Sequence, residues 1–269
     1  MMAGDYGWNY SKRYFDRLLW LSYSGWAWEF RRRLPGLLGV SRASRAKPIT
    51  LRRHDGVTLI RLRTACRRAE ENGLHFLPDP RLSAYQTPVF WLPDVMTTNL
   101  EAAAEIRRQI SIRAEPLSWQ EIPGRKSLLL VPGRRTKLSI AARGYAAQVA
   151  IDPTTAPIPL AIYLTLKVNS GRKMVETVRC LDWFARHCAG IDFEVAPRRG
   201  YAPNRLRNAL IALDGSLAGA TQRDIAIAVF GKDVVNEDWE NGVHSYKSRT
   251  RRLIKKGRKL MEKDYLNLL

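Results

Sequence analysis

The sequence predicts an α+β protein: a small antiparallel β-sheet with packed helices, and a C-terminal helix-turn-helix-like unit of three helices. Three observations support this fold class. Short apolar runs and apolar–polar alternation between Ser127 and Lys167 are typical of β-strands. Apolar residues recur every three or four positions between Asn204 and Met261, which is the period of an α-helix. The last of these helices carries a dense row of lysines and arginines.

The composition limits the classes of protein to consider. Of the 269 residues, 45% are apolar, which is enough for a buried core. The formal net charge of +20 favours a polyanionic partner, with DNA or RNA ahead of an anionic membrane surface; a basic but inert surface is the alternative. Three scattered cysteines (Cys66, Cys180, Cys188) fit a reducing compartment better than a disulfide framework.

The sequence gives no sign of a membrane segment. No apolar run is long enough to span a bilayer, and residues 1–10 lack the apolar stretch of a signal peptide. We therefore expect a cytoplasmic, nucleoid-associated protein that binds no membrane.

The segment from Thr221 to Gly231 predicts a helix with defined ends. Thr221 can accept a hydrogen bond from a first-turn amide, and Asp224 completes a capping box. Gly231 is the expected stop. The apolar positions that share one face are Ile225, Ala226, Val229 and Phe230.

The segment from Ser245 to Met261 predicts a further helix with two opposed faces. A support helix followed by a basic helix is typical of DNA readers, because a helix fits the major groove and its cations neutralise phosphates. The inner stripe consists of Tyr246, Thr250, Leu253, Gly257 and Leu260. The opposite side carries Lys247, Arg251, Lys255 and Arg258, with Ser248, Arg252, Lys256 and Lys259 beside them.

A solvated surface is the simpler explanation of a cationic helix face. Two features favour DNA binding instead: the face has almost no acidic residue before Glu262, and it follows a capped helix and a turn. The turn, from Lys232 to Val243, is longer than in the usual motif, so we interpret the unit as a variant of it.

The N-terminal region is dense in aromatic residues, and we assign residues 6–40 to an aromatic-rich helical domain. Ser11 and Ser24 are the expected caps of two helices, the second ending at Pro35. The aromatic side chains form either a satellite core or a docking surface for another subunit or protein. The candidate partner-binding residues are Trp20, Trp26, Trp28 and Phe30.

Residues 41–124 read as a linker and a connecting region of extended and helical segments. Ser41–Arg53 is either a linker or an arm that touches the DNA backbone. Within the region, Val57–Arg63 predicts a strand, Ala65–Asn72 a short helix, and Leu100–Ile112 an amphipathic helix. Residues 125–269 form the predicted sheet and the C-terminal DNA-binding domain.

Nothing in the chain predicts an enzyme, a metal site or a cofactor. The four histidines have no metal-ligand spacing, and Pro132–Lys137 lacks the glycine pattern of a phosphate loop. Acidic pairs are sparse, so a metal-dependent nuclease centre is not visible. Tyr265 alone does not make a recombinase, although a recombinase or nuclease remains an alternative.

Two motifs carry a resemblance to a known family. The first is Trp-Ala-Trp-Glu-Phe at residues 26–30, followed by Arg31-Arg32-Arg33; the second is residues 209–220 with Arg223-Asp224-Ile225-Ala226 and Phe230-Gly231. In this order they resemble the FseA/RovC type of transcriptional activator, over about residues 8–40 and 125–269. Residues 41–124 match poorly.

The resemblance implies an activator that binds double-stranded promoter DNA. The FseA branch activates excision and transfer genes of integrative and conjugative elements, and related small domains act as antiactivators; the RovC branch controls secretion genes and forms oligomers. RNA polymerase, an antiactivator and a second copy of the chain are the implied protein partners, and an antiactivator role for the chain itself is the alternative.

The resemblance also implies the DNA-binding residues. Phosphate contacts would come from Thr221, Gln222 and Arg223, and the groove would be entered or flanked by Ser245, Lys247, Ser248, Arg249, Arg251, Arg252 and Lys255. The start of the reading helix stays open, since Asn241, Gly242 and Ser245 all offer starts.

Overall fold

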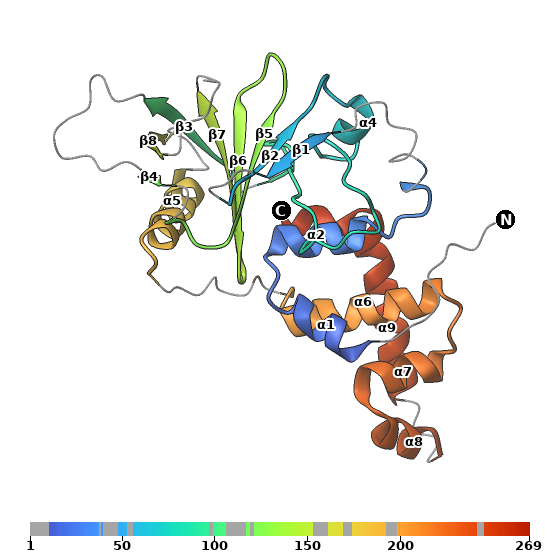
Figure 1. The fold of residues 1–269 in the computed structure, drawn as a ribbon. Coiled ribbons are helices and arrows are strands. Elements are labelled where there is room, and N and C mark those ends of the chain that lie inside the picture. The colour runs from blue at the N-terminus through green and yellow to red at the C-terminus, as the bar shows by residue number, and fades with distance from the viewer. Residues whose placement is uncertain are drawn as a thin grey trace. The chain divides into compact units, whose positions relative to one another are not determined.

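The protein has an α+β fold, seen here in a computed structural model (Figure 1). The chain divides into two compact units. A helical unit comprises Met1–Leu21, Trp26–Leu34 and Ala196–Leu268, and a sheet unit comprises Ser22–Gly25 and Pro35–Val195. The structure describes residues 11–37, 39, 48–52, 56–96, 99–105, 117–118, 121–152, 161–168, 174–191, 198, 200–240 and 245–269.

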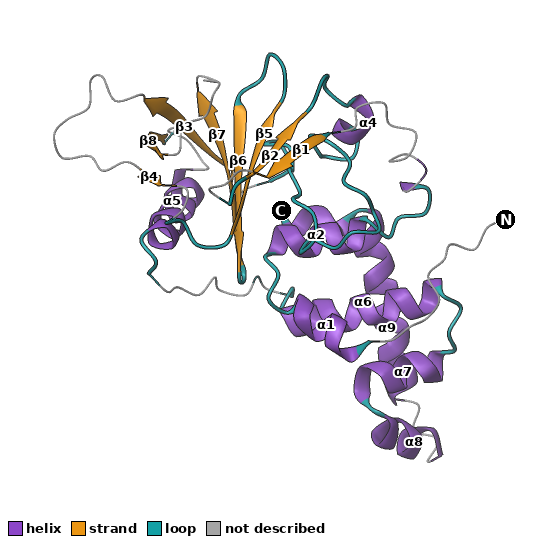
Figure 2. Ribbon diagram, viewed as in Figure 1, coloured by secondary structure: helices purple, strands orange, loops and turns teal. Residues whose placement is uncertain are grey.

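An eight-stranded sheet, in the order β1-β2-β5-β6-β7-β3-β8-β4, forms the centre of the sheet unit (Figure 2). It is mixed rather than wholly antiparallel, because β2 pairs with β5, and β3 with β7, in parallel. The strands are β1 (Ile49–Arg52), β2 (Thr58–Arg61), β3 (Asn99–Glu105), β4 (Leu117–Ser118), β5 (Arg125–Leu130), β6 (Thr136–Ala142), β7 (Tyr145–Asp152) and β8 (Ala161–Lys167).

Both faces of the sheet are covered, which explains the apolar runs in its strands. Leu128 on β5 packs with Phe184 of helix α5 (Met174–Cys188) in one buried cluster. The neighbouring Leu129 points to the other face, where it packs with Phe76 and Phe90. Alternate residues of one strand therefore reach different cores, as the two-residue period of a strand requires.

The predicted helix at Leu100–Ile112 is wrong over its described part. Asn99–Glu105 is strand β3, paired with β7 and β8; residues 106–112 lie outside the described residues. The alanine-rich sequence favours a helix, but pairing on both sides and burial of Leu100 and Ala102 outweigh that preference. The predicted strand at Val57–Arg63 and the short helix at Ala65–Asn72 are confirmed as β2 and α4 (Arg67–Glu70).

The predicted linker at Ser41–Arg53 also contains structure. Its described residues include strand β1, which pairs antiparallel with β2, while 41–47 and 53 lie outside the described residues. Together with β2, β3 and β4, the region between residues 41 and 124 supplies four strands of the sheet. The sequence patterns predicted β2 but missed β1 and β4, which are short, and β3, which depends on distant partners.

The helical unit contains six helices within the described residues, except that the first three residues of α2 are assigned to the sheet unit. They are α1 (Lys12–Leu18), α2 (Tyr23–Arg31), α6 (Pro203–Leu217), α7 (Gln222–Phe230), α8 (Lys232–Glu240) and α9 (Ser245–Glu262), followed by the 3₁₀ turn η1 (Asp264–Leu268). Ser11 caps α1 as predicted, its hydroxyl accepting from the amide of Tyr14.

The predicted cap of the second helix is wrong. Helix α2 begins at Tyr23, and the hydroxyl of Ser22, not Ser24, accepts from the Gly25 amide at 3.2 Å. Helix α6 begins at Pro203, whose fixed φ and missing N–H suit the first helical position.

Residues 214–216, including Gly215, lie inside α6. The helix runs on to Leu217, and the chain turns at Gly219, whose φ is 78°. Asp214 is held in helical conformation, where it accepts hydrogen bonds from Arg33.

Candidate nucleic-acid interface

Helix α6 is the buried support of the C-terminal helices. Its side chains Leu206, Leu210 and Leu213 have no exposed surface. Helix α9 crosses it closely at Gly257: a Cβ added there would lie 2.6 Å from the carbonyl oxygen of Ala209 and 2.9 Å from the Cβ of Leu213. The missing side chain at Gly257 therefore sets the distance between the two helices.

Helix α7 has the capping box that the sequence predicts. The hydroxyl of Thr221 accepts from the Asp224 amide at 3.1 Å, and the Asp224 carboxylate accepts from the Thr221 amide at 3.3 Å. Gly231 ends the helix with φ 100°, a conformation that favours glycine. The N-terminal end of α7 is exposed at Thr221 and Arg223, so its first turn can be reached by a ligand.

Helix α8 occupies part of the predicted long turn. It runs from Lys232 to Glu240 and buries Val235. Arg223 of α7 donates to the side-chain oxygen of Asn236 at 2.9 Å, which ties α7 to α8. The sequence feature that could have predicted this helix is Asp233, an acidic residue in its first turn, followed by the apolar pair Val234 and Val235.

Helix α9 has the two faces that the sequence predicts. Thr250, Gly257, Leu260 and Met261 are buried, while Tyr246 and Leu253 are half-buried. The exposed face carries cations and small polar residues: Ser245, Ser248, Arg249, Arg251, Arg252, Lys255, Arg258 and Lys259. Lys247 is half-buried beside them. The cationic side of the helix therefore faces solvent, and the apolar side faces the support helices.

The cations of α9 contact neutral groups. The guanidinium of Arg249 lies 4.7 Å from the ring centre of Phe230 and 5.0 Å from that of Tyr246. The Nε of Arg251 donates to the side-chain oxygen of Gln222 at 3.3 Å. Among the described residues, no carboxylate forms an ion pair with a lysine or arginine of α9. These contacts orient the side chains and leave their positive charge uncompensated.

One cation of the predicted face points elsewhere. Lys256 donates to the carbonyl oxygen of Gly200 at 2.7 Å and lies 5.1 Å from the ring centre of Tyr201. Burial and the nearby Arg205 lower the pKa of Lys256. Lys256 therefore holds the segment at Gly200 and Tyr201, just before α6, against α9, and it is not part of the outward face.

The structure brings the predicted DNA-binding residues into two adjoining groups. Thr221, Gln222 and Arg223 lie at the start of α7, and the other seven predicted residues lie within the first three turns of α9, between Ser245 and Lys255. The hydrogen bond between Arg251 and Gln222 joins the groups. The described helix starts at Ser245, whereas the alternative starts Asn241 and Gly242 lie outside the described residues.

The candidate partner-binding aromatics are mostly buried. Trp26, Trp28 and Phe30 have no exposed surface, so these three side chains offer nothing to a partner in this structure. Their burial agrees with the satellite-core interpretation of the aromatic segment. Trp20 is 49% exposed, and partner binding through it stays a prediction.

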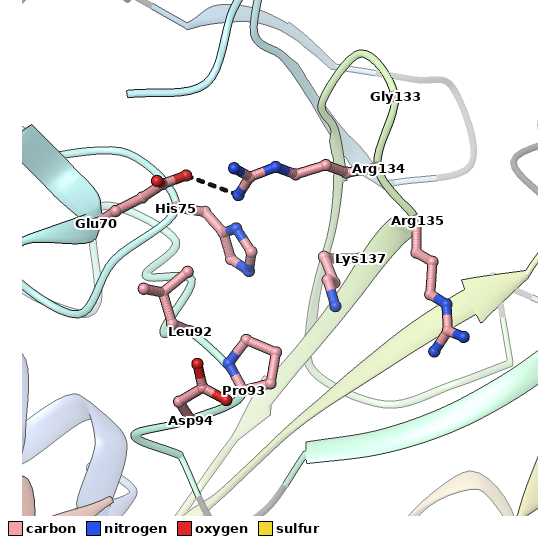
Figure 3. Close-up of a pocket in the computed structure, with 9 residues that line it drawn as sticks. All are labelled: Glu70, His75, Leu92, Pro93, Asp94, Gly133, Arg134, Arg135 and Lys137. Atoms are coloured by element: carbon pink, nitrogen blue, oxygen red, sulfur yellow. Dashed lines mark ion pairs between the residues drawn. The ribbon is translucent and has the colours of Figure 1, made fainter. Parts of the chain in front are cut away.

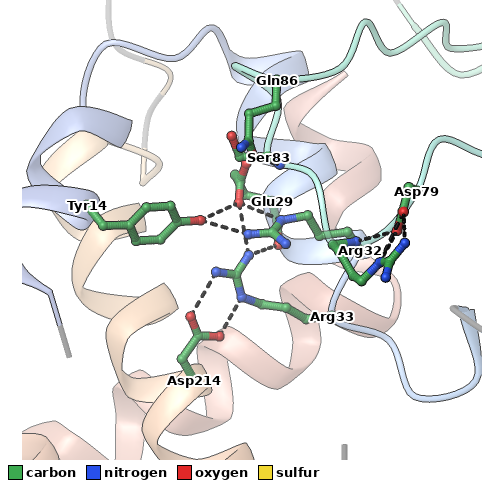
Figure 4. A network of polar contacts seen from close by, with 9 residues as sticks. Tyr14, Glu29, Arg32, Arg33, Asp79, Ser83, Gln86 and Asp214 are labelled. Atoms are coloured by element: carbon green, nitrogen blue, oxygen red, sulfur yellow. Dashed lines mark hydrogen bonds and ion pairs between the residues drawn. The ribbon is translucent and has the colours of Figure 1, made fainter. Parts of the chain in front are cut away.

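The arginines after the aromatic motif form a buried network that the sequence analysis missed (Figure 4). The carboxylate of Glu29 accepts from Arg32 at 2.7 Å and from Arg33 at 3.0 Å, and Arg33 also pairs with Asp214 of α6. The Tyr14 hydroxyl donates to Glu29 at 3.2 Å and accepts from Arg32 at 2.7 Å. The spacing of Glu29, three and four residues before the arginines, was the available signal.

This network joins three helices of the helical unit. Burial opposes the charged form of Arg33, yet Asp214 and Glu29 raise the pKa of its guanidinium well above the usual value. Arg31 lies over the ring of Tyr265 and donates to the carbonyl oxygen of Glu262 at 3.2 Å. The run of three arginines thus fastens α2 to α6 and to the end of α9.

Neither metal binding nor membrane crossing is indicated by the described residues. They contain no group of three His, Cys, Asp or Glu side chains placed to hold an ion. Within the same part of the chain, every helix is too short or too polar to cross a membrane.

A capped helix beside an outward cationic helix on a buried support is the arrangement expected of a helical nucleic-acid-binding unit. Residues 159–269 match the model of the protein family RovC_DNA-bd, described as "T6SS, Transcription factor, DNA binding domain". The match supports a DNA-binding regulator with a RovC-type domain in this part of the chain. Residues 1–158, including the Trp-Ala-Trp-Glu-Phe motif, lie outside it. No curated protein matches the chain.

Proposed function

We propose that the protein is a transcription activator that reads double-stranded promoter DNA with helix α9. The observation that carries the proposal is the exposed row of cations on α9, which faces away from the buried side of the same helix. Eighteen residues of α-helix span about 27 Å, enough to cross a major groove about 12 Å wide. No catalytic step is part of the proposal.

The arrangement assigns different roles to the residues. Lys247, Arg251 and Lys255 recur every four positions, so they lie about 6 Å apart along one side of α9 and would face the groove. Ser245, Ser248, Arg249 and Arg252 would flank that row. Thr221, Gln222 and Arg223 would meet the DNA backbone, because the positive end of a helix dipole favours phosphate and Thr221 and Arg223 are exposed there.

The targets and partners come from the resemblance and the family description. We propose genes for excision and transfer of an integrative and conjugative element as the targets, with T6SS genes as the second possibility. RNA polymerase, a small antiactivator protein and a second copy of the chain are the proposed protein partners, and Trp20 is the exposed aromatic residue that could meet one of them. An antiactivator role for the chain itself is disfavoured, because blocking a DNA reader suits an acidic surface better than a cationic one.

The test is binding of the full chain to fluorescent promoter fragments, selected first by sequencing chromatin-bound DNA from cells with the tagged protein. Arg251→Ala combined with Lys255→Ala should weaken binding about 10-fold or more, since each removed phosphate or base contact contributes about 1–3 kcal/mol. If six phosphates are contacted, affinity should fall about 10³-fold between 50 and 200 mM salt.

A matched control is Lys12→Ala combined with Arg13→Ala, which removes the same charge from exposed positions on α1. It should leave promoter affinity nearly unchanged. Equal losses in the two double variants would show that only net charge matters, and an unchanged affinity in the α9 variant would refute the proposal.

A further inference from the structure

A pocket of about 510 Å³ lies in the sheet unit, on residues that the DNA-binding proposal does not use. Its volume is in the range of sites for small organic ligands. Figure 3 shows its lining, which combines several cations with a histidine and a short apolar wall. The lining residues are Glu70, His75, Leu92, Pro93, Asp94, Gly133, Arg134, Arg135 and Lys137.

The backbone holds the two walls of the pocket in place. Gly133, with φ 68°, forms the turn between β5 and β6, and this turn places Arg134, Arg135 and Lys137 on one wall. The amide of His75 donates to the carbonyl oxygen of Phe90 at 2.9 Å, and the amide of Leu92 donates to that of Gly73 at 2.8 Å. The opposite wall is thus a cross-linked segment rather than a loose loop.

The cations of the pocket differ in how far they are neutralised. Arg134 forms an ion pair with Glu70 at 2.6 Å, and Arg135 forms ion pairs with Glu101 and Asp152, both at 3.1 Å. Lys137 forms no ion pair or hydrogen bond within the described residues, although it is only 8% exposed. Burial and then the neighbouring Arg135 lower the pKa of Lys137. An ammonium group in such a place would be stabilised by a bound anion.

His75 gives a second, independent sign of a ligand. It is 5% exposed, and both of its ring nitrogens are buried with no hydrogen-bond partner. Burial, Lys137 and Arg134 lower its pKa to about 4, so the imidazole is neutral at pH 7 and carries one N–H donor. Buried polar groups are normally satisfied, and an unsatisfied one that lines a pocket is a candidate ligand contact.

We propose that this pocket binds a small phosphate monoester, with Lys137 and the His75 ring N–H contacting the phosphate group. Arg134 lies at the rim, where a doubly negative group could compete with Glu70 for its guanidinium. Leu92 and Pro93 offer an apolar wall to the organic part of the ligand, and Asp94 can accept a hydrogen bond from a ligand hydroxyl. A duplex backbone fits less well, because the donors Lys137 and His75 are nearly buried.

The test is calorimetric titration of the full chain with glycerol 2-phosphate, inorganic phosphate and succinate at matched ionic strength. We expect saturable binding of glycerol 2-phosphate, weaker binding of inorganic phosphate, and little binding of succinate. Lys137→Gln should weaken glycerol 2-phosphate binding about 10-fold or more, since a hydrogen bond to a charged group contributes about 1.5–3 kcal/mol. The matched control Arg143→Gln removes one charge at the exposed β6–β7 turn and should bind as the wild type does.

Several results would overturn the proposal. They are the absence of saturable phosphate or glycerol 2-phosphate binding, equal binding of succinate, and an unchanged affinity in Lys137→Gln. If Lys137→Gln loses its cooperative thermal transition, Arg134→Gln decides instead, because that side chain is 40% exposed and tolerates replacement better. Loss of duplex DNA binding in these variants without binding of glycerol 2-phosphate would assign the pocket to DNA. The titration needs no DNA, so it does not depend on the proposed function.

Discussion

Two helices of the helical unit carry runs of arginine, and the two runs have opposite environments. Arg32 and Arg33, at the end of α2, are buried and bound to carboxylates of Glu29 and Asp214. Arg251 and Arg252, in the middle of α9, are exposed, and neither forms an ion pair with any described carboxylate. The charge of the first run is neutralised inside the fold, whereas the charge of the second run is exposed to solvent.

The difference shows that a dense run of cations does not by itself indicate a nucleic-acid surface. The two runs of arginine differ in whether an acidic residue lies within ion-pair distance, either on the same helix or on a neighbouring one. Glu29 stands three and four residues before Arg32 and Arg33, while α9 has no acidic residue before Glu262. Five experiments test this comparison, from the largest expected effect to the smallest.

Removing a buried arginine should have the largest effect. Arg33→Met is expected to lower the free energy of unfolding by about 3–5 kcal/mol, because it leaves the carboxylate of Asp214 without its ion-pair partner and removes one of the two arginines paired with Glu29. Urea denaturation followed by circular dichroism measures the change, with Lys12→Met as the exposed control. If the free energy of unfolding falls by less than about 1 kcal/mol, the buried arginines of α2 contribute no more to stability than exposed ones, and the comparison with α9 fails.

The buried imidazole of His75 has no acidic partner within the described part of the chain, unlike Arg32 and Arg33, and the pH dependence of stability tests this difference. The folded pKa of His75 is about 4, below about 6.5 in an unfolded chain. The unfolded state therefore binds more protons between these pH values, and the free energy of unfolding should fall by up to about 3 kcal/mol as pH drops from 6.5 to 4. Denaturation at pH 7 and at pH 4.5 measures this loss. His75→Phe should show a smaller loss, and an identical pH dependence would contradict the assignment.

The close crossing of α6 and α9 tests the buried side of α9. Gly257→Ala should lower the free energy of unfolding by about 1–3 kcal/mol, since its Cβ would meet backbone and side-chain atoms of α6. This is a net loss, which already includes the gain of about 1 kcal/mol from the higher helix propensity of alanine. Thermal unfolding measures the balance. Ser248→Ala on the exposed side is the control. If both variants are more stable than the wild type, the contact between α6 and α9 can accommodate a Cβ at position 257.

The capping box of α7 should have a smaller effect. Thr221→Ala removes the hydroxyl that accepts from the Asp224 amide, and the expected loss is about 1 kcal/mol. Thr221→Ser keeps the hydroxyl and should retain most of the stability. If both substitutions cost the same in chemical denaturation, the cap does not stabilise the helix.

The exposed cations of α9 should have the smallest effect on stability. Arg251→Ala and Lys255→Ala are each expected to change the free energy of unfolding by no more than about 0.5 kcal/mol, because they lie at the surface without ion pairs. The same pair should weaken promoter binding. A large loss of stability in the pair would show that the outward face has a structural role after all.

Patterns over a few neighbouring residues predicted the C-terminal helices α7 and α9 better than they predicted the sheet. The capping box at Thr221 and Asp224 and the two faces of α9 depend on residues within a few positions of each other, so a sequence shows them directly. Strand β3 depends on pairing with β7 and β8, which lie far along the chain, and its alanines misled the local interpretation. Helix α5 buries Cys180 and Phe184 and exposes Val175 and Val178, so an apolar side chain does not by itself reveal the buried face of a helix.

The candidate sites show the same division. The row from Lys247 to Lys255 follows from helical spacing alone. The role of Arg33 does not, because its partner Asp214 lies 181 positions further along the chain. The phosphate pocket was also missed, since His75 and Lys137 are ordinary residues in the sequence and meet only when the sheet forms.

The helical unit is assembled from both ends of the chain, and this has a consequence for synthesis. A ribosome releases α1 and α2 first, long before Asp214 and Tyr265 exist to receive Arg33 and Arg31. Arg33 and Arg31 of the nascent chain therefore have no Asp214 or Tyr265 to bind until α6 and η1 have been synthesised. For the same reason, a recombinant fragment that starts at residue 159 would contain every helix proposed to touch DNA but would lack the arginine that neutralises Asp214.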